Sequence, residues 1–136
     1  MAIRRITSAR LAEPANGAFS NCLVVGDQIF VAGMTASGGP QGGPIGGSDP
    51  YQQSCAAIEK CQWMLEAAGA SLKDVVKMTI YLTDIGHRAA FGRAREAYFQ
   101  EPRPCSTLIE VKGLAQPGML VEVDVTAIRG ASASSV

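Results

Sequence analysis

Apolar residues recur along the chain at two different spacings. Three stretches alternate apolar and polar residues, which is the period of half-buried β-strands: 75–83, 105–111 and 119–128. Residues 21–34 hold two runs rich in strand-forming residues, and the Gly26-Asp27 pair between them is typical of a tight hairpin turn. A further short strand is expected near residues 2–7.

Helical spacing appears twice, over about 50–68 and about 86–99. Asp49 suits the cap of the first helix, Pro50 suits its first turn, and Gly69 suits its end. Before this helix, residues 37–48 contain six glycines and predict a loop. Two interpretations of the loop stand, a flexible surface loop and a flap over a pocket.

This order of elements predicts an α+β domain over residues 1–129, with two helices packed on one face of a mixed sheet. Residues 130–136 are rich in Ala and Ser and predict a flexible C-terminal tail. The helices are expected to cover a face that carries Val76, Ile80, Ile109 and Val123.

The opposite face of the predicted sheet mixes apolar and charged side chains. It is expected to carry Phe30, Ala32, Met34, Lys77, Thr79, Tyr81, Ser106, Leu108, Glu110, Leu120, Glu122 and Asp124. This set is too apolar for a solvated face and too charged for a sealed core, where each ion needs a partner. We therefore expect a symmetric oligomer whose subunits pack through this face and leave clefts between them.

Composition narrows the function. The 136 residues include 12 basic and 12 acidic side chains, one His and four Cys. A neutral chain lacks the positive electrostatic potential of a nucleic-acid binder or of a polybasic membrane anchor. No apolar run approaches the roughly 20 residues of a membrane span.

One His cannot build a His-rich zinc site, so we expect no metal and no cofactor. No apolar segment follows the basic N-terminus as in a signal peptide, so we expect a cytoplasmic protein.

The residues that could take part in catalysis or binding lie at the start of the predicted strand 105–111 and on the predicted strand 119–128. Arg103, Cys105 and Ser106 lie within four residues, which fits a binding site or equally a rigid turn with a surface arginine. If Cys105 or Ser106 acted as a nucleophile, the lone His87 would have to be its base. The sequence around these residues contains no catalytic-triad signature. Glu122 and Asp124 share a strand face at about 6.8 Å and could act as paired carboxylates or form ion pairs.

Four segments resemble the RidA (YjgF-type) family of small enamine/imine deaminases, and the resemblance spans nearly all of residues 15–129. The segments are GDQIFVAG at 26–33, LEAAGASLKDVVK at 65–77, VKGL at 111–114 and PGMLVEVD at 117–124. The resemblance implies a chorismate-mutase-like subunit, a homotrimer and three clefts between subunits. In its deaminase members an Arg binds the substrate carboxylate and a Glu on the last strand positions the attacking water.

Carried over onto this chain, the family's pattern matches in part. Gly33 and Glu122 match, and Pro104 matches the signature proline. The resemblance places Ser106 at the signature arginine and Leu108 at a cysteine two residues later.

Other pocket positions differ as well. The resemblance places Phe19 where a tyrosine is usual, Ala32 where a serine is usual, and Gly92 at an asparagine of the second helix. Arg93 or Arg103 is expected to supply the missing positive charge, with Cys105 nearby.

Two functions follow from the resemblance. The first is a deaminase-type hydrolase acting on a small metabolite, with Glu122 and Ser106 as catalytic residues and a substrate preference altered by the loss of the arginine. The second is a non-catalytic trimer that binds a small molecule or has a regulatory role. A ribonuclease or translation inhibitor, named for some relatives, is disfavoured by the neutral charge and the absence of a His pair.

Overall fold

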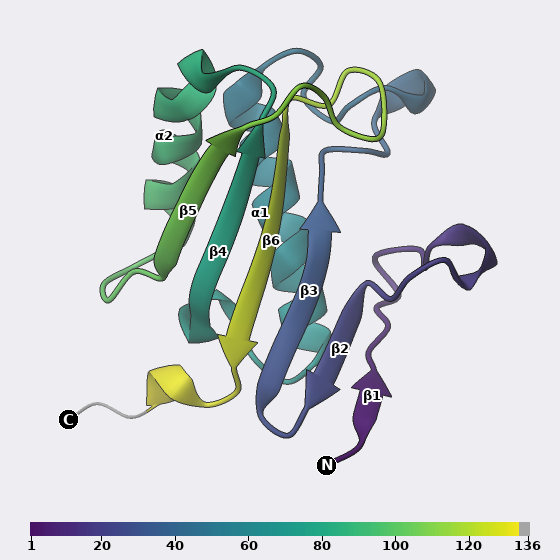
Figure 1. Cartoon of the computed structure of the whole chain (residues 1–136), viewed down its shortest axis with the longest axis vertical. Helices are drawn as coiled ribbons and strands as arrows, with labels where there is room; N and C mark the ends of the chain where they lie inside the picture. The colour runs from purple at the N-terminus through teal and green to yellow at the C-terminus, as the bar shows by residue number, and fades with distance from the viewer. Residues whose placement is uncertain (134–136) are drawn as a thin grey trace.

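The computed structural model describes residues 1–133, which form one layer of strands and one layer of helices (Figure 1). The strands are β1 (Ile3–Arg5), β2 (Cys22–Val25), β3 (Gln28–Met34), β4 (Val75–Leu82), β5 (Cys105–Glu110) and β6 (Val121–Ile128). The helices are α1 (Pro50–Ala67) and α2 (Arg88–Tyr98), and both lie on the same side of the sheet. The predicted α+β architecture with two helices on one face is confirmed.

The sheet runs in the order β1-β2-β3-β6-β4-β5. Only the β4–β5 pair is parallel among its ladders, so the sheet is mixed, as predicted. Gly26 adopts a φ of 61° in the β2–β3 turn, a conformation that favours glycine. At the start of α1, the Asp49 carboxylate accepts hydrogen bonds from the backbone N–H groups of Tyr51 and Gln52, which satisfies donors that the helix itself leaves unpaired.

The core lies between the sheet and the helices. Along β6, Val121, Val123 and Val125 are buried, while Glu122 and Asp124 on the other face are only half-buried. This alternation is the one predicted for the strand, and it fixes which side of β6 carries the carboxylates.

The side-chain orientation predicted for β5 is wrong by one residue. Ser106 is paired with Met78, Leu108 with Ile80 and Glu110 with Leu82. Because these partners on β4 are buried in the core, the three β5 side chains point toward the helices and not away from them. Ile109 lies on the uncovered face and is 42% exposed. Because β5 is an edge strand with no fully buried residue, its alternation does not identify the core side, and a shift of one residue reverses every side chain.

Irregular pairing explains two further corrections. A register shift between Val31 and Met34 turns Met34 into the core, although it was expected on the opposite face. A second shift, between Val75 and Lys77, buries Val75 and leaves Val76 37% exposed. Both are bulge-like insertions, which the period-two pattern does not reveal.

Within residues 1–133, neither α1 nor α2 covers the second face of the sheet. Phe30, Ile109 and Ile128 are each more than 40% exposed there, beside the half-buried Glu122 and Asp124. The mixed apolar and charged character expected for this face is therefore present.

Part of the predicted tail is attached to the domain. Residues 131–133 form a short 3-10 helix, and Ser132 donates hydrogen bonds from its N–H and its hydroxyl to the Asp74 carboxylate at 2.9 and 2.8 Å. The rest of that predicted tail, 134–136, lies outside the described residues. No helix in the described part of the chain is long and apolar enough to cross a membrane.

Candidate functional site

A cavity of about 360 Å³ opens where β3 extends beyond its partner β2. The pairing of these strands ends at Cys22 and Val31, and the segment before β2 folds over the end of β3. The cavity is lined by Leu11, Ala12, Pro14, Phe19, Asn21, Gly33, Met34, Thr35, Ser37, Lys60, Ala115, Gln116 and Glu122. We call it the Glu122 cavity. It brings together three of the predicted site residues: Phe19, Gly33 and Glu122.

Gly33 leaves room for the side chain of Glu122. A Cβ atom added at Gly33 would lie 2.5 Å from Oε2 of Glu122, closer than non-bonded atoms approach. The glycine therefore leaves the space in which the carboxylate sits against the backbone of β3.

The two neighbouring carboxylates of β6 have different surroundings. Asp124 accepts a hydrogen bond of 2.9 Å from the hydroxyl of Tyr81. For Glu122 no side-chain hydrogen bond or ion pair is formed within the described part of the chain. Burial, and then the nearby charge of Asp124, raise the pKa of Glu122 above its ordinary value of 4.5. Glu122 is thus an unpaired carboxylate facing a cavity, with increased affinity for a proton.

The cavity also contains a lysine that the sequence reasoning did not single out. Lys60 of α1 is only 5% exposed, and its Nζ donates to the backbone oxygen and the hydroxyl of Ser37 at 2.8 and 2.9 Å. Ser37 belongs to the glycine-rich loop. Gln53, Ala57, Lys60 and Met64 form a helical stripe of positions that the structure buries, but two of the four are polar, so the sequence shows no apolar stripe there.

The other predicted site residues lie at a second place, which we call the β5 edge: residues 103–108 together with Arg95 of α2. Cys105 is exposed there and lines a separate cavity of about 570 Å³ with Arg103. Leu108 packs against the hydrophobic core. Ser106 accepts a 3.3 Å hydrogen bond from Nη1 of Arg95.

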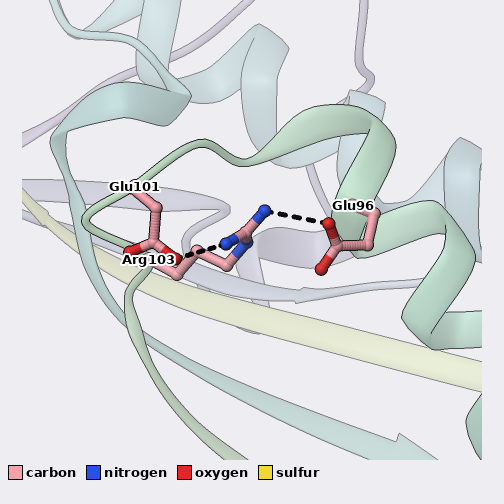
Figure 2. Close-up of polar contacts among 3 residues, drawn as sticks. All are labelled: Glu96, Glu101 and Arg103. Carbon is pink, nitrogen blue, oxygen red and sulfur yellow. Dashed lines mark hydrogen bonds and ion pairs between the residues drawn. The ribbon is translucent and has the colours of Figure 1, made fainter.

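The arginine that donates to Ser106 is Arg95, whereas Arg93 and Arg103 have other partners within the described residues. Figure 2 shows Arg103 held between Glu96 and Glu101, with the Glu96 contact at 2.9 Å. Arg93 lies over the ring of Tyr51, with the guanidinium carbon 5.1 Å from the ring centre. Neither arginine lines the Glu122 cavity.

Within one chain the two places do not meet. Ser106 points to the helix side of the sheet, whereas Glu122 lies on the other face. The structure thus brings Phe19, Gly33 and Glu122 together and leaves the predicted residues of the β5 edge apart from them. Among residues 1–133, no three His, Cys, Asp or Glu side chains are grouped as they would be around a metal ion.

Comparisons with known proteins agree with this architecture. Residues 10–129 match the family model described as Endoribonuclease L-PSP. A RutC family protein of Pyrococcus abyssi is 37% identical over 113 residues, which is 83% of this chain and 87% of the relative. The 2-iminobutanoate/2-iminopropanoate deaminase of Capra hircus is 29% identical over 94% of this chain and 92% of its own length.

A solved structure of a Pseudomonas aeruginosa protein of unknown function superposes with a TM-score of 0.83 at 37% identity, over 93% of this chain and 92% of that one. The family model covers nearly the whole described domain, and the fold and motifs agree with it. The chain therefore belongs to the Endoribonuclease L-PSP family, the family of RidA- and YjgF-type proteins that its four sequence segments indicated.

Proposed function

We propose that this protein is a cytoplasmic hydrolase that cleaves the C=N bond of small 2-imino acids, or of their enamine tautomers, in the Glu122 cavity. The observation that carries the proposal is the unpaired carboxylate of Glu122, half-buried against Gly33 in a cavity that Phe19 also lines. Membership of a family that includes a 2-iminobutanoate/2-iminopropanoate deaminase supports the choice of substrate.

The chemistry follows from the position of the carboxylate. Glu122 accepts a proton from a water molecule as the water oxygen attacks the imine carbon, which gives a tetrahedral carbinolamine. Glu122 then passes this proton to the nitrogen and accepts the proton of the carbinolamine hydroxyl as the C–N bond breaks, and the products are a 2-oxo acid and ammonia. A carboxylate with a raised pKa suits both steps, because it holds the proton between them.

A homotrimer would unite the two places that one chain keeps apart. We propose that three copies associate through the uncovered sheet face, so that the β5 edge of one subunit adjoins the Glu122 cavity of the next. The exposed apolar side chains Phe30 and Ile109 on that face support the association. In this arrangement Ser106, Cys105 and Leu108 would line the outer wall of a cleft between subunits. Sedimentation as a monomer at micromolar concentration would contradict it.

The substrate preference is proposed to differ from that of the named deaminases. The family resemblance puts the carboxylate-binding arginine at Ser106, whose hydroxyl cannot form the two parallel bonds of a guanidinium. With Phe19 and Met34 in the lining, the cavity suits an apolar substituent on the substrate.

Ammonia release from freshly generated 2-iminopropanoate and 2-iminobutanoate tests the activity. We expect the protein to accelerate release above the rate in buffer, with 2-iminobutanoate preferred because its side chain is larger. A rate equal to that in buffer for both compounds would contradict the deaminase function. If a thermal-shift screen then yields a stabilising metabolite that is recovered unchanged, the non-catalytic binding trimer takes its place.

A further inference from the structure

Three polar residues of α1 are buried, namely Gln53, Ser54 and Lys60, and of these Lys60 is left with an unpaired donor among the described residues. The hydroxyl of Ser54 donates to the backbone oxygen of Pro50 at 2.7 Å. Gln53 is fully buried; its amide nitrogen donates to the backbone oxygens of Gly47 and Gly118, and its oxygen accepts from the N–H of Leu120. These bonds explain Gln53 as a structural residue that holds two loops. Lys60, two turns further along the same stripe, has two neutral acceptors, both on Ser37.

The charge of Lys60 is not compensated by any carboxylate of residues 1–133. An ammonium has three N–H groups, and the two bonds to Ser37 leave one without a partner within the described residues. No carboxylate of those residues lies within 4.0 Å of its Nζ, since the ion pairs formed there all involve Arg103 or Arg129. Burial accordingly lowers the pKa of Lys60. A buried cation without an anion is costly, and buried charges are normally paired.

Of the described residues that line the cavity, Lys60 and Glu122 are the two with ionisable side chains. They share the cavity without forming an ion pair with each other. A ligand that places a negative group at Lys60 and a positive group at Glu122 would compensate both charges. A protonated 2-imino acid has this arrangement, with a carboxylate next to a cationic C=N group.

We propose that Lys60 binds the carboxylate of the substrate inside the Glu122 cavity, so that substrates are small acids whose cationic C=N carbon then lies next to Glu122. This inference rests on the proposed function for the identity of the reacting group. The substrate carboxylate would then be bound by a buried residue of the subunit that also supplies Glu122. Arg95 at the β5 edge would take no part in binding this carboxylate.

Lys60→Gln tests this role, because glutamine keeps an N–H donor for Ser37 and removes the charge. We expect KM for 2-iminobutanoate to rise at least tenfold while kcat changes less than threefold, and Lys60→Arg to restore most of the affinity. Lys112→Gln, which removes an exposed lysine, serves as the matched control and should leave both constants unchanged. An unchanged KM in a folded Lys60→Gln protein, or a tenfold rise in Arg95→Gln instead, would overturn the proposal.

A binding measurement separates this inference from the proposed activity. Equilibrium binding of 2-oxobutanoate and of its uncharged analogue 2-oxobutanamide needs no catalysis. We expect the wild type to prefer the acid at least tenfold and Lys60→Gln to lose the preference; retention of the preference would overturn the proposal even in a protein without deaminase activity. If Lys60→Gln does not fold, a crystal structure of the wild type with 2-oxobutanoate decides. A carboxylate oxygen within about 3.2 Å of Nζ of Lys60 supports the assignment, and a carboxylate bound at Arg95 overturns it.

Discussion

The Glu122 cavity and the β5 edge both contain charged side chains, but these form ion pairs at the β5 edge and not in the cavity. At the β5 edge, Arg103 is held by two carboxylates, and Ser106 already accepts a hydrogen bond from Arg95. In the cavity, Glu122 has no ion-pair partner and Lys60 has only neutral ones among the described residues. Paired surface charges satisfy each other. Unpaired, partly buried charges leave interactions for a ligand to complete, which is why the cavity is the better candidate for chemistry.

Among the changes that leave Glu122 in the chain, the largest effect is expected from Gly33→Ala. The added Cβ would meet the Glu122 carboxylate and displace it from the wall of the cavity. We expect kcat/KM for 2-iminobutanoate to fall at least about 100-fold, the typical worth of a positioned acid–base group. Gly113→Ala is the matched control, since a Cβ there meets no atom within 4 Å. Full activity of Gly33→Ala would mean that the position of Glu122 is not critical.

Ser106→Arg tests whether the β5 edge of one subunit adjoins the Glu122 cavity of the next across a subunit interface. We expect kcat/KM to rise about tenfold, the effect of one charge-assisted hydrogen bond to the substrate carboxylate. Ser106→Gln, which adds a shorter, uncharged amide donor, should give no gain. If Ser106→Arg forms a trimer and its activity is unchanged, the β5 edge does not reach the Glu122 cavity of a neighbouring subunit.

A smaller effect is expected on stability when Glu122 becomes Gln. Because the pKa of Glu122 is raised in the folded state, that state binds more protons than the unfolded chain between the ordinary and the raised pKa. Stability therefore falls as pH rises through this window. Chemical denaturation should show Glu122→Gln to be more stable than the wild type at neutral pH, by up to about 1 kcal/mol, and equally stable at a pH below the ordinary value. A less stable variant at neutral pH would contradict the unpaired state of the carboxylate.

The smallest effect is expected from Arg103→Gln. Its ion pairs with Glu96 and Glu101 are largely exposed to solvent, and such pairs contribute about 0–1 kcal/mol to stability. We expect a change of about 0.5 kcal/mol or less in chemical denaturation, and activity within about twofold of the wild type. A large loss of activity would move the site toward the β5 edge.

The parts of the fold that could be predicted are those with many buried contacts on one side. Helix α1 was expected over about 50–68 and extends over Pro50–Ala67, because its apolar stripe and its cap at Asp49 mark both the face and the start. Strand β6 was oriented correctly for a similar reason, since its valines alternate with polar residues. In both elements the residue pattern coincides with burial.

The parts that could not be predicted depend on neighbours distant in sequence. The orientation of β5 follows from its parallel pairing with β4, and an edge strand with mostly exposed residues does not indicate it. Glu122 and Gly33 were matched through the family motifs, whereas the space between them is a property of the folded backbone. Lys60 was missed because a lysine on a helix is normally solvent-exposed.

The replacement of Glu122 by alanine tests the central claim most directly. Its measurement is kcat/KM for 2-iminobutanoate in Glu122→Ala, beside Glu110→Ala, which removes the carboxylate that accepts a hydrogen bond from Ile85 next to the β5 edge. We predict a loss of at least about 100-fold for Glu122→Ala and activity near that of the wild type for Glu110→Ala, with both proteins folded. Equal activity of Glu122→Ala and the wild type would contradict the assignment of the chemistry to this cavity.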